Sequence, residues 1–354
     1  MRFFNIPTQD TTIYEQYSWK NTGLDEILEV GKDSSGIFRI RSLLQFDIAS
    51  ISSSFSSGLF PINTQFDLQL YIANVTNLKV GQAINIEIVS SSWVEGSGYF
   101  YQNLNSPFSS SLNPSVGYFE YDGATWLNRS SGSLWQNSGS DFYTGSIISQ
   151  SAQNPIVDMT INITSFIQTL VSGTLENDGF ILKFPDADEN DNKNAGNIKF
   201  FSKQTHTVYS PQLIAKWDDS LYITGSLSGS SPAQVIVVPK TIKTKYKVNE
   251  LTRVDLSVRD RYPIKTFDTL FTSYAGNQYL PTSSFFSVID TQSNTVIIPF
   301  DNYSKISCDG TGSYFNLNVQ GVYPGRFYKL QIKVINGSYE QIFDDGYFFS
   351  VEAV

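Results

Sequence analysis

The residues that could carry out catalysis are few, and their spacing matches no catalytic arrangement that we identify. His206 is the single histidine and Cys308 the single cysteine of the 354 residues. A serine or cysteine nucleophile needs a nearby base, and no Gly-X-Ser-X-Gly turn is present. Zinc typically needs several His or Cys ligands. We therefore expect a protein that is not an enzyme, with His206 as a hydrogen-bonded loop or strand residue and Cys308 as a small buried residue.

A run of oxygen-bearing side chains has the alternation of a calcium-binding loop. Carboxylate and amide oxygens, the ligands that calcium prefers, recur at Asp186, Asp188, Asn190 and Asn192. The run departs from that loop at its sixth position, where Asp191 replaces the glycine of the sharp turn. It departs again at its twelfth position, where Asn197 replaces a bidentate glutamate. We favour a solvated hairpin tip, keep calcium as the alternative, and expect no other cofactor.

Aromatic residues in segments rich in Gly, Ser and Asn suit the binding of a sugar. The rings that we assign to such a site are Trp135, Tyr99, Tyr101 and Trp126. Aromatic faces beside amide and carboxylate groups can stack on pyranose rings, and the same rings also suit protein interfaces. Paired carboxylates for glycoside hydrolysis are not singled out by any spacing, although acidic residues are plentiful.

The segments that must position these groups show hydrophobic alternation of period two. The alternation runs through 38–48, 66–72, 84–88, 254–258, 315–319 and 328–334. Such a period places successive side chains on opposite faces of a strand, so each strand is expected to be half buried on a sheet. Clusters of Gly, Asn and Ser between the strands read as turns. This pattern predicts an all-β fold of the antiparallel sandwich or jelly-roll type.

One segment has the period of a helix instead. Its apolar residues fall at i, i+3, i+4, i+7 and i+8, at Ile163, Phe166, Ile167, Leu170 and Val171. This spacing predicts one short helix over 163–173, with Asn162 or Thr164 as its cap and Gly173 at its end. We expect this helix to close one end of the sandwich, with its apolar face in the core.

Length and composition indicate two domains. At roughly 100–200 residues per domain, 354 residues are enough for two. A Ser- and Gly-rich stretch predicts a linker at 218–233, between a jelly-roll-like sandwich at 1–217 and a second sandwich at 234–354. The second domain has the size of an immunoglobulin domain but lacks its paired cysteines.

Charge and hydropathy restrict the partners. Charged residues make up 16% of the chain and the net charge is −9, which argues against nucleic acid as a ligand. No stretch approaches 18 consecutive apolar residues, so we expect no membrane span. The opening Met1–Pro7 has no apolar run of the length of a signal peptide, so we expect release into the cytoplasm in which the chain is made.

The order of motifs in the first two-thirds of the chain resembles the DNRLRE domain over residues 8–217. The segments that carry it are 38–47, 91–96, 123–126, 163–173, 177–184 and 210–217. The resemblance implies a β-sandwich that holds, displays or binds, akin to disaggregatase-type carbohydrate-binding modules. It also implies structural roles for Trp93 and Trp126, which stand where that family has its own tryptophans. The departure is an insert at Gly98–Tyr118, where recognition is usually placed.

The second domain resembles a module of virion proteins from marine, T-even-like tailed phages. The residues that carry this are Arg259–Pro263, Ile298–Tyr303, Cys308–Phe315 and Gly321–Tyr328. It implies a non-enzymatic structural component of the virion, at the neck, collar, tail or a fibre-attachment point. The expected partners are other virion proteins in a symmetric homo- or hetero-assembly, and assembly in the host cytoplasm explains the missing signal peptide. We expect Met1–Gln9 to act as an arm that adds to a neighbour's sheet.

A second function class stays open from the sequence. Enlarged aromatic loops favour a carbohydrate-binding or adhesion module, on a virion or on a bacterial surface, with a host surface glycan as partner. The missing signal peptide disfavours the bacterial version. A polysaccharide lyase or hydrolase would need a catalytic constellation that we do not find.

Overall fold

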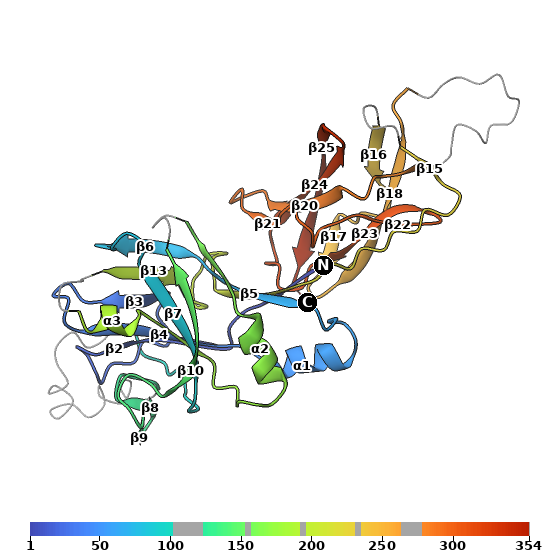
Figure 1. The fold of residues 1–354 in the computed structure, drawn as a ribbon. Coiled ribbons are helices and arrows are strands. Elements are labelled where there is room, and N and C mark those ends of the chain that lie inside the picture. The colour runs from blue at the N-terminus through green and yellow to red at the C-terminus, as the bar shows by residue number, and fades with distance from the viewer. Residues whose placement is uncertain (102–122, 153–156, 192–195, 231–234, 263–277, 354) are drawn as a thin grey trace, which may run out of the picture. The chain divides into compact units, whose positions relative to one another are not determined.

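The computed structural model describes residues 1–101, 123–152, 157–191, 196–230, 235–262 and 278–353. This part of the chain is all-β with three short helices, and its strands form several sheets (Figure 1). The expected fold class is thereby confirmed. The chain divides into an N-terminal unit, Asn5–Ile214, and a C-terminal unit, which joins Met1–Phe4 to Ala215–Val354. None of the helices in the described ranges is long and apolar enough to span a lipid bilayer.

The elements up to residue 216 are fourteen strands and three helices within the described ranges. The strands are β1 (Arg2–Asn5), β2 (Gln9–Tyr14), β3 (Ile27–Lys32), β4 (Arg39–Gln45), β5 (Gln65–Leu70), β6 (Ile72–Thr76), β7 (Ala83–Val89), β8 (Asn128–Ser130), β9 (Ser133–Leu134), β10 (Phe142–Ser151), β11 (Met159–Asn162), β12 (Phe180–Lys183), β13 (Asn197–Phe201) and β14 (Gln212–Lys216). The helices are α1 (Ile48–Ser56), α2 (Thr164–Val171) and α3 (Asp186–Glu189).

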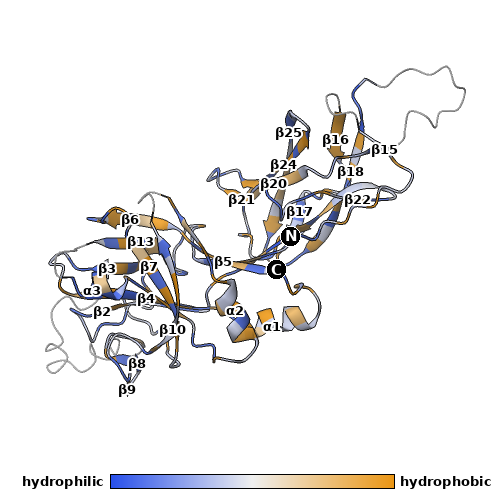
Figure 2. Cartoon of the chain, in the orientation of Figure 1, coloured by the Kyte–Doolittle hydropathy of each residue, from blue (hydrophilic) through white to orange (hydrophobic). Residues whose placement is uncertain are grey.

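The remaining elements belong to the C-terminal unit. They are β15 (Ser228–Gly229), β16 (Val235–Pro239), β17 (Lys245–Lys247), β18 (Leu251–Asp260), β19 (Gln278–Tyr279), β20 (Ser284–Asp290), β21 (Val296–Ile298), β22 (Ser307–Asp309), β23 (Gly312–Asn318), β24 (Phe327–Asn336) and β25 (Tyr339–Glu352). Hydrophobic and hydrophilic residues alternate along many of these strands (Figure 2), which is the pattern that predicted them.

A large sheet organises the N-terminal unit. Seven of its strands follow the order β10-β7-β12-β4-β3-β13-β6, and β2 pairs with β4 beside this path. A second sheet has the order β1-β14-β5-β11, and the boundary between the two units falls within β1 and β14. On one face of the large sheet, Leu44 and Ile88 flank Phe180 as cross-strand neighbours, and all three are fully buried.

The other face of the large sheet is buried as well, which differs from the half-buried strands that we expected. Leu43 and Ile181 are neighbours there and, with Ile13 and Val89, form the floor of a second hydrophobic cluster. Three tryptophans from the following loops cover this floor, Trp93, Trp126 and Trp135. Period two alone could not reveal this covering, because it is supplied by residues far away in the sequence.

The helix predicted over 163–173 is present as α2, but its N-cap is Ile163, without a capping side-chain hydrogen bond, in place of the predicted Asn162 or Thr164. Its residues Phe166, Ile167 and Leu170 are buried, and the Phe166 ring stacks on Phe180 with centroids 6.2 Å apart. Helix α1, which contacts α2, was not predicted from the sequence. Its segment is rich in serine, a poor helix former, and it begins where the Asp47 side chain accepts a hydrogen bond from the Ser50 N–H.

A buried ion pair fixes α3 and a tryptophan loop against strand β4. The Arg41 guanidinium donates to both carboxylate oxygens of Glu189, at 2.9 and 2.5 Å, and the two side chains are 6% and 2% exposed. Arg41 also donates to the Gly139 carbonyl at 2.7 Å and lies 5.0 Å from the Trp126 ring centroid. Gly139 has φ +90°, and a Cβ there would stand 2.7 Å from Trp126, so a side chain is excluded.

The C-terminal unit contains a four-stranded and a five-stranded sheet. Their orders are β16-β18-β23-β22 and β17-β25-β24-β20-β21, and a short parallel pair joins β15 to β19. Phe286 of one sheet stacks on Phe315 of the other, with ring centroids 4.2 Å apart. Cys308 is fully buried, as the sequence predicted.

Residues Met1–Phe4 are part of this unit, so they do not form the free arm that we expected. Phe3 and Phe4 are buried, Arg2 forms an ion pair with Asp301, and the Asn318 amide donates to the Arg2 carbonyl at 3.1 Å. Met1–Phe4 therefore already forms buried contacts and hydrogen bonds within its own chain.

Loss of the buried ion pair should cost far more stability than loss of an exposed one. We expect Glu189→Ala to lower the free energy of unfolding by about 3–5 kcal/mol, since Arg41 would be left buried without its partner. The control is Glu340→Ala, which removes a pair between a half-exposed Glu340 and Lys333 and should cost less than about 1 kcal/mol. Urea unfolding of both variants checks this, and equal losses would contradict it.

Candidate ligand-binding groove

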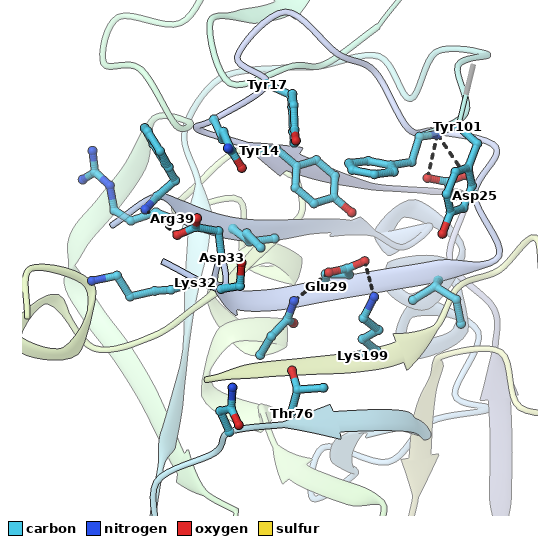
Figure 3. Close-up of a pocket in the computed structure, with 18 of the residues that line it drawn as sticks. Tyr14, Tyr17, Asp25, Glu29, Lys32, Asp33, Arg39, Thr76, Tyr101 and Lys199 are labelled. Carbon is cyan, nitrogen blue, oxygen red and sulfur yellow. Dashed lines mark hydrogen bonds and ion pairs between the residues drawn. The ribbon is translucent and has the colours of Figure 1, made fainter. Parts of the chain in front are cut away.

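An open groove of about 780 Å³ lies over one part of the large sheet in the N-terminal unit (Figure 3). Side chains from five strands line it, among them Tyr14 of β2, Glu29 of β3, Arg39 of β4, Thr76 of β6 and Lys199 of β13. Two loop segments add further walls, one at Gln16–Tyr17 and one at Tyr99–Tyr101. The groove is thus assembled from regions of the chain that are almost 200 residues apart.

Aromatic rings form one wall of the groove. The Phe100 ring lies at the centre, with ring centroids 4.9 Å from Tyr14, 5.6 Å from Tyr17 and 5.7 Å from Tyr101. Tyr14 is buried beneath this cluster, whereas Tyr17, Tyr99 and Tyr101 are 36%, 41% and 79% exposed. The buried rings therefore support three tyrosines that face solvent at the groove.

The loop that carries these rings is held by a buried amide. The Asn21 Nδ2 donates to the carbonyls of Glu95 and Ala124 at 2.7 and 2.8 Å, and its Oδ1 accepts from the Gly98 N–H at 2.8 Å. Gly96 has φ +80°, and a Cβ there would lie 2.5 Å from the Asn21 side chain. Glycine is therefore required for this close approach.

The floor of the groove is polar. The Glu29 carboxylate accepts from the Asn197 amide at 2.6 Å and from Lys199 at 2.8 Å (Figure 3). At the aromatic end, both oxygens of Asp25 accept from the Phe100 N–H, at 3.1 and 3.2 Å. Burial raises the pKa of the Asp25 carboxyl to about 6, against the lowering effect of that hydrogen bond. The groove thus offers ring faces together with carboxylate, amide and ammonium groups.

Two of the rings predicted for a sugar site do lie at the groove, and two do not. Tyr99 and Tyr101 line it. Trp126 and Trp135 are only 3% and 5% exposed and belong to the tryptophan-covered cluster, where no ring face is open to a ligand. Trp135 donates its indole N–H to the Thr125 carbonyl at 2.9 Å, as a buried indole should. The assignment of these two tryptophans to a sugar site is therefore corrected to a core role.

The calcium alternative gains no support from the described residues, and a short helix stands where we favoured a hairpin tip. Asp186 and Asp188 lie in helix α3, not in an open loop, and each pairs with a lysine. The partners are Lys183 at 2.5 Å from Asp186 and Lys79 at 2.6 Å from Asp188. The hydrogen bond from Lys183 lowers the pKa of Asp186, whose side chain is otherwise 75% exposed. Asn190 caps the helix, and Asn192 lies outside the described residues. Within those residues, no group of three or more His, Cys, Asp or Glu side chains is arranged for a metal.

Several groove residues were not found from the sequence. No pattern in the sequence marked four of them as groove residues, namely Tyr17, Asp25, Glu29 and Lys199. Lys199, for example, lies opposite Glu29 only because β13 pairs with β3. Phe100 stood inside the Tyr99–Tyr101 cluster, which was the one usable sign. The insert that follows this cluster, from residue 102 to Tyr118, lies outside the described residues.

Comparison with known proteins does not assign a family. No protein-family model matches the chain, and no curated protein matches it. Among solved structures, a DUF4785 family protein from Legionella pneumophila is similar at 8% identity and TM-score 0.20, covering 99% of this chain. A β-glucuronidase from Parabacteroides merdae is similar at 8% identity and TM-score 0.21, covering 96%. This chain spans 61% and 36% of their lengths, and at these TM-scores neither likeness carries an argument.

A buried carboxyl helps to hold the groove's aromatic loop. The Asp10 side chain is 1% exposed and accepts from the Lys203 N–H at 2.6 Å, while the Asp10 N–H donates to Glu95 at 2.9 Å. Lys203 in turn forms an ion pair with Glu95 at 2.8 Å. Burial is the main cause that raises the pKa of Asp10 from 3.8 to about 7.

This pKa predicts a stability that falls as the pH rises. Because the folded pKa of Asp10 lies above the unfolded value, its stabilising effect is complete below the unfolded pKa and is lost as the pH rises through about 7. Between pH 5 and pH 8, wild type should lose about 2–3 kcal/mol of unfolding free energy relative to Asp10→Asn. Urea unfolding at both pH values checks this, and parallel pH profiles of the two proteins would refute it.

Proposed function

We propose that the N-terminal unit is a non-enzymatic carbohydrate-binding module and that the groove is its binding site. The observation that carries this proposal is the set of three exposed tyrosines at a polar groove, of which Tyr17 and Tyr101 contact the Phe100 ring and Tyr99 lines the groove. A sugar ring has an apolar face, which suits stacking on tyrosine, and hydroxyl groups, which suit the donors and acceptors of the floor. The volume of the groove falls in the range typical of small-molecule sites.

The resemblance of residues 8–217 to the DNRLRE domain supports the same proposal, since that family is akin to carbohydrate-binding modules. Rigid support of the aromatic loop supports it too. The three hydrogen bonds of the Asn21 side chain hold the loop before any ligand arrives. A preformed site loses less conformational entropy on binding, so modest contacts can yield useful affinity.

Removal of one groove tyrosine should weaken glycan binding without unfolding the protein. A glycan array of the wild type identifies a ligand, and calorimetry then compares Tyr101→Ala with the matched control Tyr339→Ala, an exposed tyrosine of the C-terminal unit. We expect Tyr101→Ala to bind about three- to tenfold more weakly, the loss of one stacking contact, and the control to bind as wild type. An array without any bound glycan, or equal affinities of the two variants, would sink the proposal.

A second proposal concerns the C-terminal unit: we infer that it serves as a structural component of a virion, at a neck, collar, tail or fibre attachment. The supporting observation is a row of cross-strand neighbours, three of them apolar and one a lysine, on the outer face of its five-stranded sheet. Val296, Ile289, Lys329 and Phe348 are cross-strand neighbours over β21, β20, β24 and β25. Val296 and Phe348 are each 51% exposed.

A second row runs parallel to the first. Phe285 and Ile342 flank Lys333 on the same face, and Ile342 is 48% exposed. Apolar side chains thus alternate with the lysines of β24 on this face, and exposed apolar groups rimmed by charge are typical of surfaces that pack against another protein. Binding by one unit and docking by the other are compatible, so the two proposals do not compete.

The docking proposal is tested on assembled particles. We expect electron cryomicroscopy of the native particle to show ordered, symmetric copies with the Val296–Phe348 row covered by a neighbour. A variant with Phe348→Asp and Ile342→Asp should fold but fail to enter particles, whereas the control Leu134→Asp, an exposed leucine of the N-terminal unit, should enter normally. Particles without this chain, or normal entry of the double variant, would exclude the structural role.

A further inference from the structure

The positive charges of the groove are all engaged by groups of the protein. Arg39 donates to both oxygens of Glu15 at 2.6 and 2.8 Å, and Lys199 donates to Glu29 at 2.8 Å. Lys32 is 1% exposed and donates to the Asp191 carbonyl at 2.8 Å. A negatively charged ligand in this groove would therefore have to break an existing pair before it could find a counter-charge.

Two carboxylates at the groove, those of Asp25 and Glu26, have partners of another kind. Within the described residues, neither Asp25 nor Glu26 has a lysine or arginine nitrogen within ion-pair distance. Asp25 accepts from a backbone N–H beside Tyr101 (Figure 3), and Glu26 is exposed with His206 Nε2 at 3.5 Å. Lys20 is the cation whose charge acts on Asp25, so the two carboxylates of Asp25 and Glu26 outnumber it at the aromatic end of the groove.

The aromatic wall already packs against one ammonium group. The Lys20 Nζ lies 4.4 Å from the Phe100 ring centroid and 5.3 Å from that of Tyr17, and it donates to the Phe100 carbonyl at 2.5 Å. Ring faces attract cations, and a carboxylate nearby adds to that attraction. A ligand ammonium beside Asp25 would meet that carboxylate and the exposed Tyr101 ring from the solvent side, with the Lys20 charge on the far side of Phe100 as the opposing group.

We infer that the groove selects saccharides that carry a protonated amino group, such as oligosaccharides of glucosamine, over N-acetylated and uronic-acid saccharides. This inference rests on the proposed carbohydrate-binding function. Stacking on Tyr17 and Tyr101 would hold the ring, and Asp25 and Glu26 would receive the ammonium. An N-acetyl group cannot supply that charge, and a uronate would be repelled by the same carboxylates.

The test compares oligosaccharides of equal length made of glucosamine, N-acetylglucosamine or galacturonate, by calorimetry at pH 6.5. Wild type should bind the glucosamine oligomer about tenfold more tightly than the N-acetylated one and should bind the galacturonate oligomer most weakly. Asp25→Asn, which keeps an acceptor for the Phe100 N–H, should remove this preference, so that the ratio of the two affinities falls to about one. Glu26→Gln, at an exposed position, provides a second neutralisation that does not depend on a buried contact.

The control for overall charge is Asp345→Asn, at an exposed carboxylate of the C-terminal unit. It should keep the tenfold preference. A preference that survives in Asp25→Asn and in Glu26→Gln would reflect non-specific attraction to an acidic protein and would overturn the inference. Equal or tighter binding of the N-acetylated or galacturonate oligomer overturns it as well, while the proposed function stands. Binding of none of the three, with no ligand on the array, overturns both.

Discussion

The N-terminal unit depends on one buried charge, the Arg41 guanidinium, and on the groups gathered to satisfy it. Burial of a guanidinium costs several kcal/mol of free energy unless its N–H groups find hydrogen-bond acceptors. Here the acceptors are the Glu189 carboxylate and the Gly139 carbonyl. Those partners come from α3 and from the loop before β10, so the charge draws both segments onto strand β4. Trp126 then lies over Arg41 and Arg39, with centroid distances of 5.0 and 5.1 Å, and brings the other tryptophans into one cluster.

The tryptophan cluster determines which part of the large sheet is open to a ligand. The tryptophan cluster rests on Ile13, Leu43, Val89 and Ile181, which belong to β2, β4, β7 and β12. The groove opens instead over β3, β13 and β6, where charged and amide side chains such as those of Glu29 and Lys199 replace the apolar floor. The large sheet therefore carries a buried apolar cluster over some of its strands and a solvent-exposed groove with an aromatic wall over others.

Local patterns were enough to predict what depends on neighbours in sequence. The alternation of strands, the i, i+3, i+4 spacing of α2 and the burial of Cys308 are of this kind. Trp135 was misassigned because its burial depends on which strands lie beneath its loop, and no local pattern contains that information. For the same reason the pattern at Asp186 and Asp188 could not reject the calcium alternative, since Lys79 comes from a loop more than 100 residues away. Carboxylates at alternate positions show which oxygens could bind a metal ion. Whether they are available for it depends on the side chains that the fold places beside them.

The aromatic wall of the groove contains a contact between a lysine and aromatic rings that also holds the Asp25 carboxylate in place. Lys20 is buried, and its ammonium is stabilised by the Phe100 carbonyl and by the faces of Phe100 and Tyr17. That contact orients Phe100, and its N–H then holds Asp25 beside Tyr101. The carboxylate is kept partly dehydrated, which is why burial raises its pKa to about 6. A partly dehydrated carboxylate gains more from an approaching cation than an exposed one does, because less of its hydration remains to be removed on binding. The arrangement that supports the loop thus also places the Asp25 carboxylate at the aromatic end of the groove.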